Sequence, residues 1–336
     1  MVPPPYSGNP ALSPPSPQTP LTFGQILDRI FRLMRLHWKP FLGIGLLPSC
    51  ALLLYYAFFF GALYFAGIFK NPRANPDPAT MFGVVLPLGL LFLPIVLALY
   101  GLFHGAISFA ALQAIRQSQV TARSSFRHAW SKISRYIWLM VLQSLIAVIP
   151  ILVCAFFIGS GAALLGFVKH GNANPAGLFF LVPLAILIYL GAIAYAVIVF
   201  LRLSLAFAAC VGEDLAAWKA IKRSGVLTQG AKGRIFLVLL VTYALGYVAF
   251  MVFYAVGLLV FAVGAVASQG HLQSASPTVI LFMACTGVLL AAVFLIWTAI
   301  MLASYSVALA VLYYDQRLRK EGPAFLLLPN PVLPGA

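Results

Sequence analysis

Long apolar runs separated by short polar segments organise this chain. Six of these runs exceed the length of about 20 mostly apolar residues that an α-helix needs to cross a bilayer. The predicted spans are Pro40 to Phe69, Met81 to Ala114, Tyr136 to Val168, Leu178 to Val211, Ile235 to Ala267 and Pro277 to Tyr313. The pattern therefore predicts an all-α integral membrane protein with about six transmembrane helices.

The segments between the spans are of two alternating kinds. Three are short, and their basic residues are Lys70, Arg73 and Lys169. The other segments hold 17 basic residues, which are Arg29, Arg32, Arg35, Lys39, Arg116, Arg123, Arg127, Lys132, Arg135, Lys219, Lys222, Arg223, Lys232, Arg234, Arg317, Arg319 and Lys320. Because basic loops stay in the cytoplasm, the asymmetry predicts a multi-pass inner (plasma) membrane protein with both termini cytoplasmic.

A short basic segment with helical apolar spacing precedes each odd-numbered span. The apolar positions are Phe23, Leu27, Ile30 and Met34 in the first, Phe126, Trp130, Ile133 and Ile137 in the second, and Leu215, Trp218 and Ile221 in a looser third. Apolar faces flanked by Lys and Arg are typical of helices that lie in the membrane interface. Thr22 and Gln25 predict a capping box for the first helix, and Asp214 is expected to cap the third. The chain thus repeats an interfacial helix plus two spans three times.

Finer features of the spans indicate how they bend and pack. Five prolines offer kink sites in the first four spans: Pro48, Pro87, Pro94, Pro150 and Pro183. Gly101 and Gly105 form a G-x-x-x-G step in the second span, which suits close helix contact.

Composition narrows the possible partners. Hydrophobic residues make up 62% of the chain and charged residues 8%, whereas soluble domains carry about 25% charged residues. The net charge is +15, and the charges fall between apolar runs, which favours an anionic membrane surface over nucleic acid. Residues 1–20 contain eight prolines and no charge, so they are predicted to form a disordered cytoplasmic tail, either without a partner or as a proline-motif ligand. Residues 21–321 are the predicted membrane domain, and residues 322–336 are the C-terminal tail.

The sequence offers no catalytic constellation. None of the six carboxylates lies inside a predicted span, and the five histidines are scattered without metal-ligand spacing. No metalloprotease, phosphate-loop or serine-hydrolase motif is present. We therefore expect no enzymatic activity, no cofactor and no metal.

Arg202 is a charged residue inside a predicted span. One interpretation is an arginine whose long side chain reaches the interface or bonds a carbonyl. The other is a structural ion pair or an anion-binding arginine inside the bundle. The second interpretation predicts a buried polar cluster in which Arg202 meets Asp315, or otherwise Asp28 or Glu213.

Basic residues of the short segments are the predicted contacts for anionic lipid headgroups. These residues are Arg29, Arg32, Arg35, Arg127, Lys132, Arg135, Lys219, Lys222 and Arg223.

Three stretches carry a family resemblance: LTFGQILDRIFRLMRLHWKPFL, LRLSLAFAACVGEDLAAWKAIKRSGVLTQGAKGRIFLVLL and ALAVLYYDQRLRKEG. They resemble the membrane domain of glycerophosphoryl diester phosphodiesterases. The matching positions are Arg202, Glu213, Arg223, Ser224, Leu227, Tyr314, Asp315, Arg317, Arg319, Lys320 and Glu321. In some relatives a catalytic barrel follows this domain, and its histidine, arginine and acidic metal site are missing here. The resemblance therefore implies a stand-alone membrane domain. After Glu321 the chain departs from the family, because an apolar tail replaces an acidic ending.

Two hypotheses of function follow. The first is a non-catalytic membrane protein that organises or senses lipids, or scaffolds a partner. The second is a transporter or channel for a lipid-like or anionic solute. A polar-lined cavity that reaches Arg202 would favour the second, and a tightly packed bundle would favour the first.

Overall fold

The computed structural model describes residues 20–65, 78–116, 119–169, 175–267 and 277–322, and these residues form helices and no β-strand. Six helices are long: α2 (Trp38–Phe65), α3 (Pro78–Ile115), α5 (Ile133–Lys169), α6 (Pro175–Leu203), α9 (Lys232–Ala267) and α10 (Pro277–Glu321). Four are short: α1 (Phe23–Leu36), α4 (Ala122–Ser131), α7 (Ala206–Gly212) and α8 (Ala217–Thr228).

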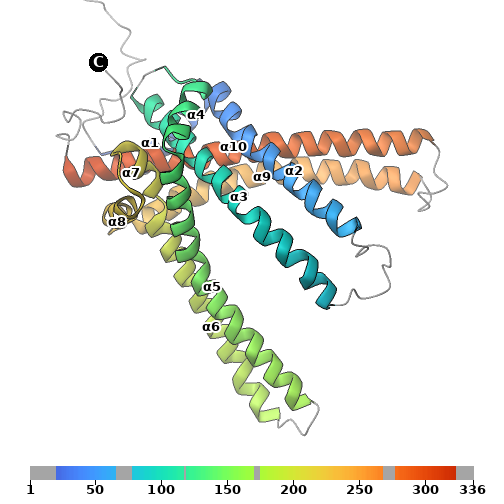
Figure 1. Cartoon of the computed structure of the whole chain (residues 1–336). Helices are drawn as coiled ribbons and strands as arrows, with labels where there is room; N and C mark the ends of the chain where they lie inside the picture. The colour runs from blue at the N-terminus through green and yellow to red at the C-terminus, as the bar shows by residue number, and fades with distance from the viewer. Residues whose placement is uncertain (1–19, 66–77, 117–118, 170–174, 268–276, 323–336) are drawn as a thin grey trace, which may run out of the picture.

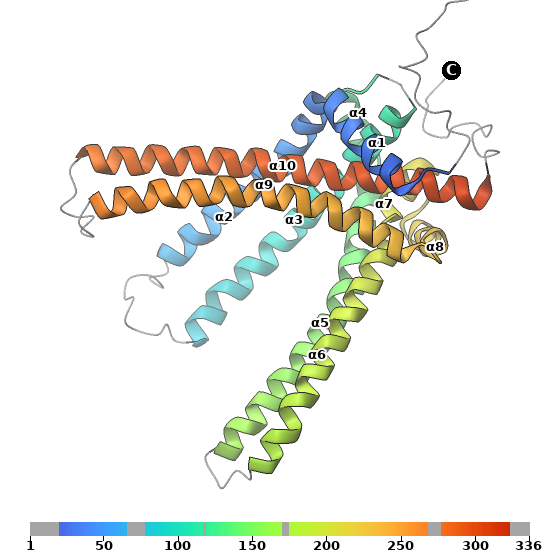
Figure 2. The ribbon, with the colours of Figure 1, turned by 180° about the vertical axis from the view of Figure 1, so that it is seen from behind.

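The long helices pair into three hairpins, α2–α3, α5–α6 and α9–α10. The hairpins diverge from one common end of the molecule (Figures 1 and 2). Their surfaces expose large apolar side chains such as Leu54, Leu187 and Val288, which are 68%, 68% and 72% exposed. Each hairpin helix is long and apolar enough to cross a bilayer, and only lipid solvates such a surface. The chain is an all-α polytopic membrane protein, as the sequence predicts.

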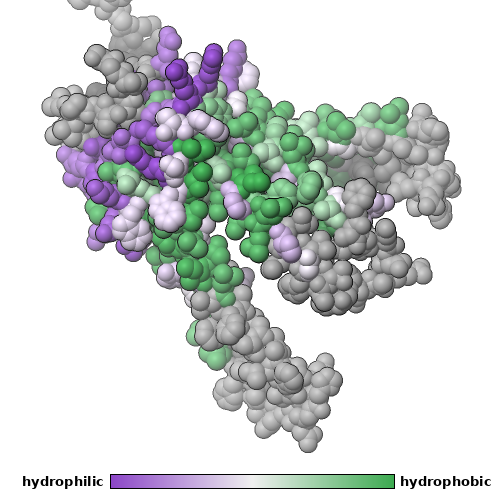
Figure 3. Space-filling view, in the orientation of Figure 1, coloured by the Kyte–Doolittle hydropathy of each residue, from purple (hydrophilic) through white to green (hydrophobic). Residues whose placement is uncertain are grey.

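The short helices gather at the end where the hairpins meet (Figure 1). We call this end the polar cap: α1, α4, α8 and the last turns of α10 from Asp315 to Glu321. Figure 3 shows hydrophilic surface concentrated over this end and mostly hydrophobic surface on the coloured parts of the hairpins next to it. The order short helix, long helix, long helix occurs three times, as α1–α2–α3, α4–α5–α6 and α8–α9–α10. The chain therefore has the predicted repeat, with α7 as an addition between the second and third units.

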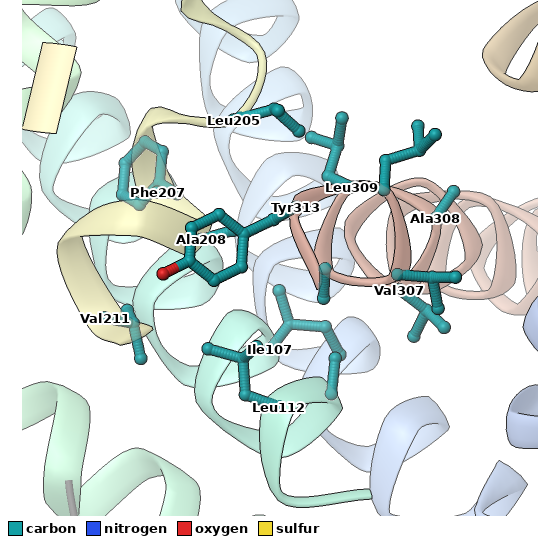
Figure 4. Close-up of a cluster of buried hydrophobic side chains, with 14 of the residues drawn as sticks. Ile107, Leu112, Leu205, Phe207, Ala208, Val211, Val307, Ala308, Leu309 and Tyr313 are labelled. Atoms are coloured by element: carbon teal, nitrogen blue, oxygen red, sulfur yellow. The ribbon is translucent and has the colours of Figure 1, made fainter. Parts of the chain in front are cut away.

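The core lies directly beneath the polar cap, where α3, α7 and α10 meet. Ile107 of α3, Phe207 of α7 and Val307 of α10 belong to one buried cluster (Figure 4). All seven residues of α7 are buried. The insertion therefore fills the space between the three diverging hairpins, and it joins them into one core.

Two helix ends differ from the prediction. The fourth candidate span runs to Gly212, close to the predicted Val211, but its helix is interrupted, because α6 ends at Leu203 and α7 begins at Ala206. The hydroxyl of Ser204 donates to the carbonyl of Leu201 at 2.8 Å, and Gln143 Nε2 donates to the carbonyl of Leu203 at 2.9 Å. These side chains thus donate hydrogen bonds to carbonyls that would otherwise accept from the backbone N–H groups of the next helical turn.

The sixth span extends beyond Tyr313, because α10 continues to Glu321. Two ion pairs at i, i+4 spacing support the extra turns: Arg319 with Asp315, and Arg317 with Glu321.

The apolar faces of the short helices are turned largely toward the protein's own core rather than toward lipid, although Trp130 and Trp218 are exposed. On α1, Ile26, Ile30 and Leu33 are buried, and the helix packs on α10 and α9. On α8, Ile221 and Leu227 are buried. The protein's own core is the nearest apolar surface. The apolar faces of α1 and α8 therefore pack against it, and their basic faces are exposed. The predicted capping box of Thr22 and Gln25 on α1 is confirmed.

Candidate functional site

Asp315 is the centre of the first ionic cluster of the polar cap. Its side chain is fully buried and accepts hydrogen bonds from the Leu21 backbone N–H at 2.9 Å and from Arg319 Nε at 2.9 Å. Arg234 Nη2 lies 3.6 Å from the same carboxylate. Both arginines also donate to the carbonyl of Leu21. The cluster therefore fixes the chain just before α1 to α9 and α10.

Glu213 and Glu321 form a second cluster at the ends of α7 and α10. Arg223 of α8 donates to both carboxylates. Arg317 donates to Glu321 at 2.7 Å, and the Tyr313 hydroxyl donates to Glu213 at 2.8 Å. Two cations face two anions, so this cluster is balanced in charge and ties α8 to α10.

Asp214 holds the third cluster, on the second unit. It accepts hydrogen bonds from Lys132 Nζ and Arg135 Nη1, both at 2.5 Å. Burial acts to raise the pKa of this carboxyl, but the two hydrogen bonds outweigh it and leave the pKa below its ordinary value. Asp214 also adopts a positive φ of 53°. Asp214 therefore does not cap α8, whose N-cap Ala216 makes no side-chain hydrogen bond.

The predicted cluster of Arg202 with Asp315 does not form. Arg202 is exposed near the end of α6, and its Nε lies 3.2 Å from the point where a Cβ on Gly225 would stand. It makes no ion pair with a carboxylate in the part of the chain that the structure describes. Since α6 ends one residue later, Arg202 can lie across α8 rather than point into the bundle. Of the two alternative partners, Asp28 pairs with Arg32 on the exposed face of α1, and Glu213 pairs with Arg223.

The nine predicted lipid contacts divide into two groups. Lys132, Arg135 and Arg223 belong to the internal ion pairs described above, and Arg29 lies 5.6 Å from the centre of the Tyr314 ring. Burial lowers the pKa of Arg29 from its ordinary value. The other residues are exposed: Arg32, Arg35, Arg127, Lys219 and Lys222. The second group remains available to ligands outside the protein.

A central cavity of about 340 Å³ lies between the hairpins, on the membrane side of the polar cap. It is lined from α3, α5, α9 and α10 and from both sides of the break between α6 and α7. Its polar side chains include His104, Ser204, Tyr305 and Ser306, and none of its described lining residues is charged. Ser306 Oγ lies 3.4 Å from His104 Nδ1. Arg202 is not part of this lining, so the cavity can bind uncharged polar groups better than anions.

Sequence reasoning missed Arg234 as a partner of Asp315, and it missed the tyrosines of the cavity. Arg234 looked like one more basic loop residue, although it lies in the first turn of α9. Tyr100, Tyr243 and Tyr305 come from three different helices. The only signal for these tyrosines in the sequence is that a polar hydroxyl recurs within otherwise apolar runs.

A scan against protein-family models finds no match for this chain, and searches of curated proteins and of solved structures find none either. The resemblance to the phosphodiesterase membrane domain therefore stays a hypothesis that rests on the quoted stretches.

Proposed function

We propose that this chain is a non-catalytic, lipid-associated membrane protein whose polar cap binds the anionic headgroups of the cytoplasmic leaflet. The observation that carries the proposal is a set of exposed cations on the three short helices. Arg35, Arg127, Lys219 and Lys222 make no ion pair with any of the described carboxylates. Each basic residue close to an anionic surface contributes about 1 kcal/mol of binding.

Tryptophans support this placement of the polar cap at the headgroup level. Trp38, Trp130 and Trp218 belong to three different units and are 54%, 67% and 53% exposed. Lys39 lies 5.7 Å from the centre of the Trp38 ring, and Lys222 lies 5.7 Å from that of Trp218. Tryptophan is enriched where a membrane protein crosses the interface. The pairing of a ring with a cation suits a surface that contacts both acyl chains and headgroups.

The non-catalytic part of the proposal draws on the use of the carboxylates. Each of the five described carboxylates holds at least one cation. A carboxylate that is held in a structural ion pair is less available for general acid–base chemistry. The role that fits is to organise or sense anionic lipid, or to hold a protein partner at the membrane surface.

The alternative is a transporter or channel for a lipid-like or anionic solute. The central cavity favours a lipid-like solute, because its lining is largely apolar with a few uncharged polar groups. The main argument for transport of an anionic solute was Arg202, and this residue does not line the central cavity.

The test compares two sets of substitutions in the full protein, reconstituted with phosphatidylglycerol and phosphatidylcholine. Arg35→Gln, Arg127→Gln, Lys219→Gln and Lys222→Gln remove four charges, whereas Arg35→Lys, Arg127→Lys, Lys219→Arg and Lys222→Arg keep them. Spin-labelled lipids report the preference of the protein's lipid shell for the anionic headgroup. We expect this preference to fall by about fivefold per charge removed at low salt, which corresponds to roughly 1 kcal/mol each. An unchanged preference in the glutamine variant would refute the proposal.

A further inference from the structure

The central cavity continues into two apolar arms. Next to it lies a waist of about 270 Å³, which shares Tyr100, Tyr243 and Leu302 with it. An arm of about 640 Å³ between α2 and α3 adjoins the waist at Pro48 and Leu52. A second arm of about 310 Å³, lined mainly by α9 and α10, adjoins it at Leu53 and Phe294. Because neighbouring spaces share lining residues, the four lie next to one another, and together they outline a forked site.

The parts of the fork follow one order along α3 and α10. On α10 the central cavity covers residues 302–309, the waist 294–302 and the second arm 290–294. On α3 the cavity covers residues 100–108 and the first arm 92–100. In both cases the polar part is nearest the polar cap, and the arms run toward the hairpin tips (Figure 1). This is the orientation of a lipid in the leaflet that the polar cap faces.

The central cavity presents hydrogen-bonding groups without partners. The hydroxyls of Tyr100, Tyr243 and Tyr305 line it, and they make no hydrogen bond with any residue that the structure describes. His104 has one contact at its Nδ1, with Ser306, and its Nε2 has none within the described chain. These groups open onto the cavity rather than being sealed inside the protein, and Tyr243 is 44% exposed. A ligand with hydroxyl or ester groups would satisfy them.

The depth of the cavity selects against a charged headgroup. Ser306 lies nine residues before Asp315 on α10, which places it about 14 Å further from the polar cap along the helix at 1.5 Å per residue. A phosphate at that depth needs a cation, and no described residue of the lining supplies one. A small uncharged headgroup needs only the hydroxyls and the imidazole that are present.

We propose that the forked site binds an uncharged two-chain lipid of the diacylglycerol type, with its glycerol hydroxyl in the central cavity and one acyl chain in each arm. The site lies inside the bundle and uses none of the cap's exposed cations, so the proposal goes beyond the binding of anionic headgroups. The spaces are open along one side rather than enclosed, and the hairpins diverge beside them. The lipid enters laterally from the bilayer.

The test is photolabelling of the full protein in nanodiscs with a photoreactive diacylglycerol analogue. Ala147→Phe fills the central cavity from α5, and Tyr305→Phe removes one hydroxyl without changing the shape. Ala244→Phe is the matched control, since Ala244 is exposed on α9 outside all four spaces. We expect Ala147→Phe to lower labelling at least fivefold and Tyr305→Phe about two- to tenfold, the equivalent of one uncharged hydrogen bond. The control should label like the wild type.

Competition with unlabelled lipids tests the headgroup and the chain number separately. Diacylglycerol should displace the probe from the wild type, whereas phosphatidic acid and monoacylglycerol should require at least tenfold higher concentrations. Equal competition by phosphatidic acid would overturn the uncharged headgroup, and equal competition by monoacylglycerol would overturn the two-arm site. Wild-type labelling in Ala147→Phe would overturn the location, provided that its melting temperature in detergent matches that of Ala244→Phe. If Ala147→Phe fails to fold, Tyr305→Phe decides in the same way.

Discussion

The Asp315 carboxylate is the most deeply buried group among the described ion pairs of the polar cap. This carboxylate faces Arg234, Arg319 and the backbone N–H of Leu21. The same two arginines also donate hydrogen bonds to the carbonyl of Leu21. A buried carboxylate is stable only when such donors surround it. The cluster thus gives α1 a fixed position, because the residue before its capping box is held by α9 and α10.

We predict that Asp315 is coupled to Arg319 and not to Arg202. Asp315→Ala should lower the free energy of unfolding by about 1.5–3 kcal/mol, the range for hydrogen bonds to a charged group. Arg319→Ala should cost less alone, because its side chain is 34% exposed. The double variant should lose less than the sum, whereas Asp315→Ala with Arg202→Ala should be additive.

Thermal unfolding in detergent measures both double-mutant cycles. A coupling between Asp315 and Arg202 would contradict the geometry of the polar cap and restore the cluster that the sequence suggests.

The sequence identifies the residues of these clusters better than their pairings. Asp315 and Glu213 were expected in a polar cluster. Each of them does lie in an ionic cluster, but the two clusters are different. Their partners depend on where helices end, and a long apolar run does not reveal that α6 stops at Leu203. One of the hydrogen bonds that end α6 comes from Gln143, which lies 60 positions from Leu203 in the chain, and no local pattern encodes such a contact.

At the scale of helices, close contacts between different hairpins depend on glycines at the points where their helices meet. The Gly101 and Gly105 step does make a tight contact: Tyr136 of α5 lies across both residues. Gly45 of α2 meets the backbone of α10, since a Cβ on it would stand 2.5 Å from the Ala299 carbonyl oxygen. Small residues allow such approach between membrane helices, where packing replaces the hydrophobic effect.

We predict that Gly45→Ala destabilises the protein and that Gly61→Ala does not. Both glycines lie in α2, and a Cβ on Gly61 would meet nothing within 4 Å. Overpacking against a backbone costs about 1–3 kcal/mol, whereas alanine in an open helical position gains up to about 1 kcal/mol. Melting temperatures in detergent should therefore move in opposite directions. Equal shifts would mean that the α2–α10 contact is looser than the structure has it.

The sequence predicts the helices well because each signal is local. Apolar length gives the six spans, and the Thr22 capping box gives the start of α1. It does not predict what the short helices contact, because an apolar stripe looks the same whether it faces lipid or protein. Ile30 on α1 is therefore interpreted from the sequence as a lipid contact, although it is fully buried in the core.

At the scale of the whole molecule, three similar units share one core at the polar cap and separate toward the hairpin tips (Figure 2). The number and order of the units follow from the alternation of apolar and basic segments. The divergence of the hairpins and the forked site do not, because lipid and a neighbouring helix are equally apolar partners for Leu or Val. The forked site arises where residues from all three hairpins meet, and the spacing of these residues along the chain does not reveal it.

The arrangement of the three units predicts the topology in full. Each unit leaves the polar cap through its first long helix and returns through its second, so all hairpin tips should lie on the side opposite the cap (Figure 1). With the basic cap held in the cytoplasm, alkaline phosphatase fused after Asn75, Asn172 or Gln273 should be active, because that enzyme works only outside the cytoplasm. Green fluorescent protein fused after Ser118 or Gly230 should fluoresce, and the two reporters should give reciprocal signals at every position. Phosphatase activity at Gly230 would mean that the third unit runs opposite to the first two, and the shared polar cap would then be impossible.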